Sequence, residues 1–347
     1  MAIDLTCAVL TSAYFLAEAA FADSAKKADY VVEVEAAKAI IENTTAKIDY
    51  ITDSQKKQTA RIYWSKFCNG TVATTEPDFC EITGPEADAA CKDYIINQRV
   101  NTTFTIDEKN YETSNLNVPE VLGDNMLKSM KAMDEKIAQM IVAKLGTFVT
   151  GNLYQEGLGC SDETGDWLTT YINPTYWSPS LYAYFVKTAK LNRFTNAFLL
   201  DGSNLFDHIV AAQTNEGNSN GKGNAAYLNM MKTYSDLFNM ETIAPGKTYM
   251  IERGSVAFAN KALWKGVTPQ NAMSHGVDGV KYSVPSKNLP GVVYDVYVKK
   301  NCSSEFEKLD VLMETRFLTA NGAEACNGAT GVLEFACGAC PAIEPGS

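Results

Sequence analysis

Cysteine is the residue type in this sequence with the widest chemical repertoire, because thiolates bind metals, attack electrophiles and form disulfides. The chain has nine cysteines, and Cys337 and Cys340 form a Cys-x-x-Cys pair near the C-terminus. A redox pair belongs at a strand-to-helix turn, and a zinc site needs a second pair at compact spacing. Only PAIEPGS follows Cys340, and Cys302 and Cys326 are too far apart to supply that second pair. The pattern therefore favours structural thiols or disulfides, with metal binding left open.

The remaining residues form no catalytic constellation. The sequence has no G-x-S-x-G elbow, no phosphate-binding G-x-x-x-x-G-K-[ST] loop and no H-E-x-x-H zinc helix. It has two histidines, and Asp207 beside His208 is typical of a solvated surface pair. We therefore expect no enzymatic activity, no cofactor and no metal site among these residues.

Length and charge narrow the class of protein further. A chain of 347 residues predicts about two structural units. Acids outnumber bases 41 to 30, which argues against a nucleic-acid binder held by its own basic surface. Residues 8–22 are apolar like a signal peptide, but no base precedes them and Glu18 interrupts them. We expect neither secretion nor a membrane-spanning helix.

The first third of the chain predicts a helical region followed by a long excursion. Residues 1–60 are rich in Ala, Lys and Glu and predict helices. Residues 61–67 and 99–106 predict two strands linked by an irregular stretch, so 61–113 forms an extended hairpin loop. A lone hairpin rarely buries apolar side chains in water, so we expect this one to pack on a neighbouring subunit. The side chains that need such burial are Ile62, Trp64, Phe67, Val100 and Phe104.

The clearest helix spans residues 119–145, where apolar residues recur every three or four positions. Pro119 suits its first turn and Gly146 follows its end. We expect its stripe to pack under the C-terminal strands, and the acidic pair Asp134-Glu135 to lie on its exposed face. The predicted core positions of the stripe are Leu122, Met126, Met130, Met133, Ile137 and Ile141.

The rest of the chain mixes helices with strands. Helices are predicted over about 178–192 and 225–238, and strands over 198–202 and 247–261. Four further strands are expected in the C-terminal third, within residues 281–284, 291–300, 308–320 and 330–337. This order predicts an α+β fold.

Several of these segments, taken in order, resemble a known family. Residues 61–75 and TTFTIDEKNYE (102–112) are similar to the two strands of an extended loop, and 119–145 to a long spine helix. Residues 190–206 are similar to the entry of an axial domain, and 246–261 and 330–335 to late strands. Over roughly residues 60–335 the chain resembles a tailed-bacteriophage major capsid protein of the Hong Kong 97 type.

The resemblance implies a domain plan. Residues 1–60 would form the N-terminal arm and 61–113 the extended loop. Residues 114–195 and 246–347 would form the peripheral domain around the spine helix, and 196–245 the axial domain.

The resemblance also implies a function and partners. The chain would be a structural coat subunit that assembles in the host cytoplasm into the hexamers and pentamers of a virion shell. It would enclose double-stranded DNA without sequence-specific contact, and its other partners would be portal, scaffold or decoration proteins, with no membrane. The crosslinking Lys, Asn and acid of some relatives have no matching position here. An encapsulin-like nanocompartment shell and a secreted, disulfide-stapled binding protein or adhesin remain as alternatives.

A coat assembled in reducing cytoplasm cannot depend on disulfides to fold, but released particles meet an oxidising medium. On this reasoning we expect two bridges to close after release. The expected pairs are Cys80 with Cys91 in the extended loop, and Cys326 with Cys337 or Cys340 near the C-terminus.

Overall fold

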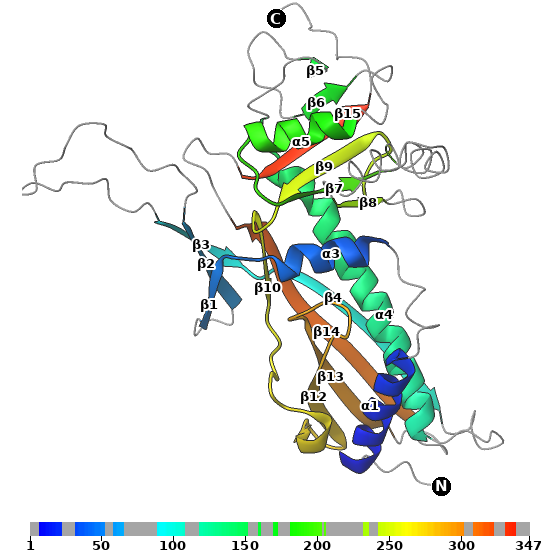
Figure 1. The fold of residues 1–347 in the computed structure, drawn as a ribbon. Coiled ribbons are helices and arrows are strands. Elements are labelled where there is room, and N and C mark those ends of the chain that lie inside the picture. The colour runs from blue at the N-terminus through cyan, green and yellow to red at the C-terminus, as the bar shows by residue number, and fades with distance from the viewer. Residues whose placement is uncertain are drawn as a thin grey trace, which may run out of the picture. The chain divides into compact units, whose positions relative to one another are not determined.

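The fold is seen in a computed structural model of the 347-residue chain (Figure 1). It describes residues 7–22, 32–52, 58–65, 89–107, 118–151, 159–160, 169–172, 181–202, 205, 232–235, 242–301, 308–322 and 330–337. The chain divides into two compact units, each assembled from three separate stretches. The first contains residues 1–42, 96–143 and 258–318, and the second contains 43–95, 144–257 and 319–347.

The first unit is built on an antiparallel sheet whose strands come mostly from the last third of the chain. Its order is β10-β14-β13-β12-β11, and β4 also pairs with β14. Three of the four predicted C-terminal strands are thus present in this sheet and pair with strands that are next to them in the chain, as short connections favour. The fourth, within residues 330–337, belongs to the second unit. The bounds are β4 (Gln98–Asp107), β10 (Val256–Asn260), β11 (Met273–Ser274), β12 (Gly279–Pro285), β13 (Val293–Asn301) and β14 (Lys308–Asn321).

One face of this sheet is covered by the long helix α4 (Val118–Lys144), within one residue of the predicted bounds. Figure 1 shows α4 running beside β4 and β12–β14. The hydroxyl of Tyr282 on β12 lies 3.7 Å from the sulfur of Met126 on α4. Burial of each large apolar side chain of the stripe stabilises the unit by about 1.5–3 kcal/mol. The predicted stripe is buried throughout, at Leu122, Met126, Met130, Met133, Ile137 and Ile141.

Two N-terminal helices complete the first unit, α1 (Cys7–Ala22) and α3 (Val32–Glu42). A side chain at Gly123 of α4 would meet the carbonyl oxygen of Ala13 at 2.7 Å, so α1 lies directly against α4. A short 3-10 helix, η5 (Pro269–Asn271), also contacts α1. None of the helices within the described ranges has the length and apolarity needed to cross a membrane.

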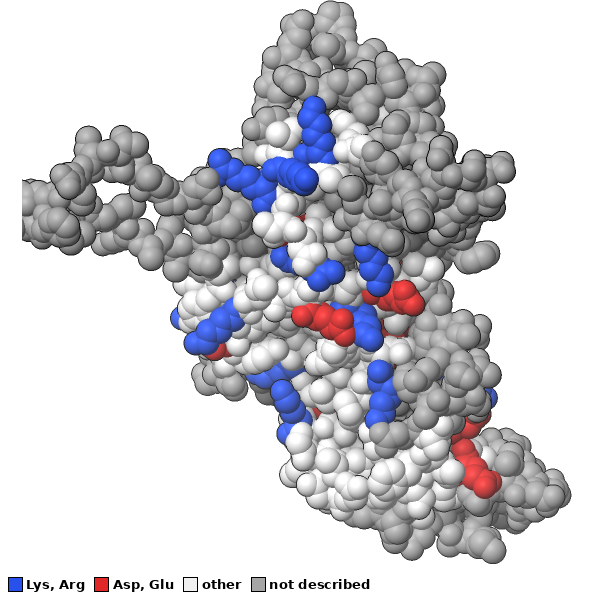
Figure 2. Space-filling model, viewed as in Figure 1, with Lys and Arg blue, Asp and Glu red and all other residues white. Residues whose placement is uncertain are grey.

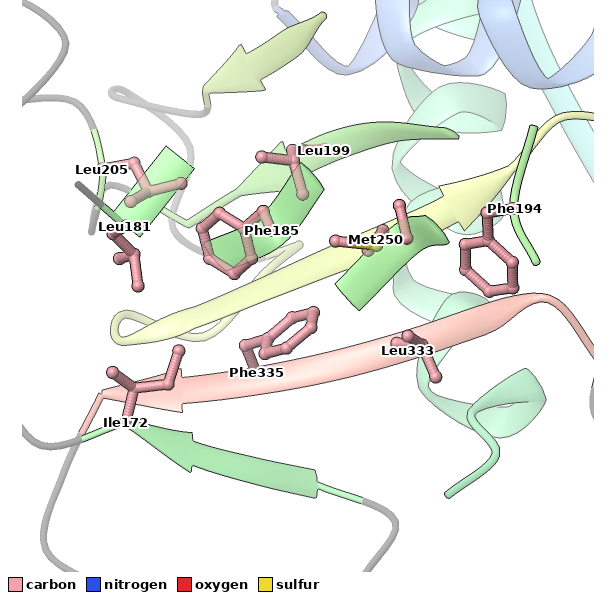
Figure 3. Packing of buried hydrophobic residues seen from close by; sticks show 10 residues of the cluster. Ile172, Leu181, Phe185, Phe194, Leu199, Leu205, Met250, Leu333 and Phe335 are labelled. Carbon is pink, nitrogen blue, oxygen red and sulfur yellow. The ribbon is translucent and has the colours of Figure 1, made fainter. Parts of the chain in front are cut away.

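The second unit has its own six-stranded mixed sheet, in the order β5-β6-β15-β9-β7-β8. Helix α5 (Leu181–Leu191) covers it, and its Phe185 meets Phe335 of β15 edge to face at 4.9 Å (Figure 3). The cluster also includes Leu199 and Met250 from the neighbouring strands. The bounds are η2 (Leu145–Phe148), β5 (Gly159–Cys160), β6 (Thr169–Ile172), β7 (Ala197–Asp201), β8 (Thr233–Ser235), β9 (Lys247–Glu252) and β15 (Val332–Cys337).

A separate antiparallel sheet in the second unit consists of β1 (Lys47–Thr52), β2 (Gln58–Ser65) and β3 (Ala89–Ile95). The prediction of helices over residues 1–60 is therefore wrong at 47–52 and 58–60, which are strands. Polar and apolar residues alternate over Lys47–Tyr50, the two-residue period of a strand, but the Ala- and Lys-rich composition of residues 1–60 hides this short signal.

The predicted domain plan needs a second correction. Residues 144–195, 246–257 and 319–347 were expected in the unit of the long helix, but they belong to the other unit. The reason is strand pairing: β15 pairs with both β6 and β9, and β9 pairs with β7. The predicted helix over 225–238 is also wrong at 233–235, where β8 pairs in parallel with β7, and its remaining residues lie outside the described ranges except Lys232. The α+β class itself is confirmed.

Candidate functional site

The small β1–β3 sheet contains the described residues at the start of the predicted extended loop, which was expected to pack on a neighbouring subunit. In its register Asp49, Arg61 and Asp93 stand side by side across the three strands. The Arg61 guanidinium donates to both carboxylate oxygens of Asp93, from Nε at 2.5 Å and from Nη2 at 2.8 Å. This two-pronged hydrogen bond holds the pKa of Asp93 below its usual value and joins β2 to β3 at an exposed position of the sheet.

The opposite face of the same sheet is apolar at its centre. Ile62 and Ala60 of β2 are fully buried there, whereas Trp64 is half-buried. One exposed apolar side chain lies on each face: Tyr50 of β1 stands opposite Ala60 on this face, and Ile95 of β3, with 54% of its surface accessible, stands opposite Thr59 on the face of Arg61. A three-stranded sheet that leaves such groups in water gains stability if a further surface covers them.

The structure does not bring the five predicted loop residues together, because Val100 and Phe104 belong to β4 in the first unit. Ile62 and Trp64 share β2, and Phe67 lies outside the described residues. Phe104 was predicted on the returning strand of the hairpin, which is wrong: it belongs to β4 and faces Val311 of β14 in the first unit. The returning strand is β3, whose residues 89–95 pair with 59–65 of β2.

The reason for this correction is that residues 98–107 pair with β14 and not with β2. Ten consecutive residues of β4 pair with β14, from Gln98 opposite Phe317 to Asp107 opposite Lys308. Salt bridges from Arg99 to Glu314 and from Lys308 to Asp107 support that register. The seven-residue β3 is matched to β2 instead. The extended loop therefore ends near residue 95, not at 113.

The cysteines lend no support to the predicted bridges. Cys91 of β3 is a free, exposed thiol, so the predicted Cys80–Cys91 disulfide is not formed. Cys80, Cys326 and Cys340 lie outside the described residues, as does the side chain of Cys337 at the end of β15. Within the described ranges no group of three or more His, Cys, Asp and Glu side chains is arranged to hold a metal ion.

A buried carboxyl on α4 is the site residue that the sequence analysis placed wrongly. Asp134 was predicted on the exposed face, but only 1% of its surface is accessible. Its Oδ1 accepts hydrogen bonds from the hydroxyls of Ser286, at 2.7 Å, and Tyr294. Its Oδ2 is buried without a partner. Burial raises the pKa of Asp134 to about 7, against the opposing effect of the two hydroxyls.

A second carboxylate group lies on the far face of the same sheet. Glu314 of β14 is buried and is paired with Arg99, with Arg316 at 4.0 Å. Asp295 stands opposite Glu314 on β13 and accepts hydrogen bonds from the backbone N–H groups of Leu263 and Trp264. Burial raises the pKa of Asp295, and Glu314 adds to the rise. Each carboxylate has fixed partners, which indicates a structural network.

Comparison with known proteins gives matches only among solved structures. No protein-family model matches the chain, and no curated protein matches it. A capsid structure of the cyanophage P-SCSP1u is similar over 87% of this chain and 89% of that one, at 9% identity and a TM-score of 0.47. A structure from Mycobacterium phage Adephagia covers 89% and 91%, at 12% identity and a TM-score of 0.42. The mature capsid of bacteriophage PhiM1 covers 83% and 84%, at 9% identity and a TM-score of 0.40.

Proposed function

We propose that the chain is the major capsid protein of a tailed double-stranded DNA bacteriophage, and that many copies form the icosahedral shell of the virion. The observation that carries the proposal is the packing of the first unit. Its 27-residue helix α4 buries an entire stripe against an antiparallel sheet drawn mostly from the last third of the chain. A spine helix on such a sheet is what the sequence resemblance to Hong Kong 97-type coat proteins implies.

The two units and the small sheet take the corresponding roles in this proposal. The first unit, with α4, is the peripheral domain, and the second unit's six-stranded sheet with α5 is the axial domain. The β1–β3 sheet is the base of the extended loop, whose exposed Ile95 and Tyr50 are covered by a neighbouring subunit. The subunits form hexamers and pentamers by these contacts, and portal, scaffold or decoration proteins complete the particle.

Charge and chemistry support a containing role. The buried carboxyl groups of Asp134 and Asp295 accept hydrogen bonds from hydroxyl and backbone N–H donors, which is typical of a structural role. The chain carries a net charge of −11, so it encloses DNA as a closed wall and makes no sequence-specific contact with it. The exposed free thiol of Cys91 disfavours the alternative of a disulfide-stapled secreted binder.

Light scattering on the purified chain tests the proposal. We expect particles of megadalton mass from the 37.9 kDa chain. Ile95→Asp places a charge on the exposed apolar position of β3, so it should reduce particle yield while the melting temperature of the dissociated subunit stays unchanged. Ala132→Asp, at an exposed position of α4, serves as the control. A wild-type chain that stays a monomer or small oligomer contradicts the proposal. Shells that form around a protein cargo instead of DNA favour the encapsulin-like alternative.

A further inference from the structure

A pocket of about 330 Å³ lies within the second unit, beside the β1–β3 sheet and the turn between β9 and β10. Its lining is polar and basic: two arginines, Arg193 and Arg253, accompany the hydroxyl-bearing Thr45, Thr195 and Ser255. The indole of Trp64 also lines it, and its ring N–H has no hydrogen-bond partner. A buried donor without an acceptor costs free energy, so an oxygen-bearing occupant would stabilise this wall.

The backbone of the β9–β10 turn places Arg253 at the corner of the pocket. The amide of Ser255 donates to the carbonyl of Glu252 at 3.2 Å, and Gly254 has a φ of +85°. A β-turn with positive φ at its third residue requires glycine there and exposes the residue before it. A side chain at position 254 would also meet Thr45 Oγ1 at 2.6 Å. The turn therefore packs closely against Thr45, which precedes β1, and leaves the side chain of Arg253 exposed.

Arg193 occupies the pocket's other side at a position that favours glycine. It follows the end of α5, where the amide of Phe194 donates to the carbonyl of Ala189 and that of Arg193 to Lys190. These two bonds define a Schellman motif, whose left-handed residue is usually glycine. Arg193 has a φ of +63°. The chain thus keeps an arginine where glycine would be more stable, which points to use of its guanidinium.

Among the described residues no salt bridge joins either arginine to a carboxylate. Glu252 also lines the pocket, but its carboxylate accepts hydrogen bonds from the amide and hydroxyl of Thr195 and from the amide of Asn196. Figure 2 shows Lys and Arg side chains, with little acidic surface between them, over the region that Figure 1 labels α5 and β9. The pocket therefore lies in a local positive field on a chain of net charge −11.

We propose that this pocket binds an aspartate or glutamate side chain from a second copy of the chain, an inference that rests on the proposed shell function. Two guanidinium groups suit a carboxylate, which they can hold by charge-assisted hydrogen bonds, and the hydroxyl of Thr45 lies in the same lining. The hydroxyls of Thr195 and Ser255 already donate to Glu252. The chain itself supplies the ligand, with 41 acidic residues against 30 basic ones. A concave pocket also admits a projecting side chain, whereas the phosphates of duplex DNA lie along a convex surface that repels the acidic chain.

The test combines Arg193→Gly with Arg253→Gln in the full chain, with Lys187→Gln on α5 as the matched control. Glycine at position 193 suits the left-handed backbone, so the double variant should fold with an unchanged or higher melting temperature. Titration calorimetry with hexaglutamate measures carboxylate binding by dissociated subunits. We expect about tenfold weaker binding for the double variant and none of this loss for the control. Particle assembly should need about tenfold more subunit, judged by light scattering.

Other outcomes overturn the inference. Unchanged hexaglutamate binding by the double variant removes the pocket as a carboxylate site. Normal empty shells combined with a loss of packaged DNA assign the arginines to phosphate instead. If wild-type subunits form no shells, the proposed function fails, while the hexaglutamate titration still decides whether the two arginines bind carboxylates.

Discussion

Asp134 of α4 accepts a hydrogen bond from the hydroxyl of Tyr294 on β13, and both side chains are buried. Ser286 donates to the same carboxylate oxygen, so the long helix is tied to the sheet by a carboxyl group with two hydroxyl donors. No basic side chain within the described ranges pairs with this carboxyl group, and Glu135 next to it raises the pKa of Asp134 further. This link makes the first unit sensitive to pH.

The direction of that sensitivity follows from the pKa. The ordinary pKa of an aspartate is 3.8, and in the folded chain that of Asp134 is about 7. The folded state therefore holds a proton that the unfolded state has released, so this carboxyl stabilises the fold at low pH and the stabilisation is lost as pH rises from about 4 to 7. The loss amounts to about 2–4 kcal/mol for this group.

Asp134→Asn tests this prediction because the amide is nearly isosteric and does not titrate. Urea unfolding between pH 5 and pH 8 should show that the variant gains stability relative to wild type as pH rises. Tyr294→Phe, which removes the donor, should lower the free energy of unfolding by about 1–3 kcal/mol at pH 8. Equal pH dependence in wild type and Asp134→Asn contradicts the assignment of a raised pKa to this carboxyl.

The apolar stripe of α4 gives a second prediction. Met133→Asp puts an unpaired charge among buried side chains and should destabilise the first unit by several kcal/mol, on the order of 3 kcal/mol or more. Ala132→Asp makes the same change at the exposed neighbouring position and should leave the unfolding midpoint nearly unchanged. Denaturant unfolding followed by circular dichroism compares the two. Similar unfolding midpoints for the two variants would mean that a different face of α4 packs against the sheet.

The pairing of β4 with β14 gives a third prediction. Arg99 is paired with the buried Glu314, so Arg99→Gln leaves a buried carboxylate with only the weaker partner Arg316. We expect a loss of about 1–3 kcal/mol in the free energy of unfolding. Arg61→Gln, which breaks the exposed pair with Asp93, should leave the unfolding midpoint nearly unchanged. An equal effect of the two substitutions would show that burial of Glu314 does not govern the strength of this pair.

The reactivity of the Cys91 thiol gives a fourth prediction. Because its thiol is free and exposed, iodoacetamide should label it in the native protein, and peptide mass spectrometry locates the label. Cys91→Ser should not change the melting temperature. Recovery of a Cys80–Cys91 disulfide peptide from freshly purified protein contradicts the structure at this point.

How far the sequence predicts this fold depends on whether the deciding interaction is local. The helix from 118 to 144 carries its own periodicity and termini, so its bounds follow from the sequence within one residue. The partner of residues 98–107 does not follow from the sequence, because an amphipathic strand can pair with β2 or with β14. Only the pairing of all the other strands in the fold selects β14. Asp134 was misplaced for a similar reason: hydroxyls of Ser286 and Tyr294, about 150 residues away, make its burial tolerable. The pocket beside Arg193 is lined by residues from five separate stretches of the chain, so it has no signature in the sequence.

Negative-stain electron microscopy of the purified chain tests the central claim most directly. The account predicts closed, icosahedral shells of uniform diameter, built from this chain alone. A field of dispersed particles no larger than a few subunits would contradict it.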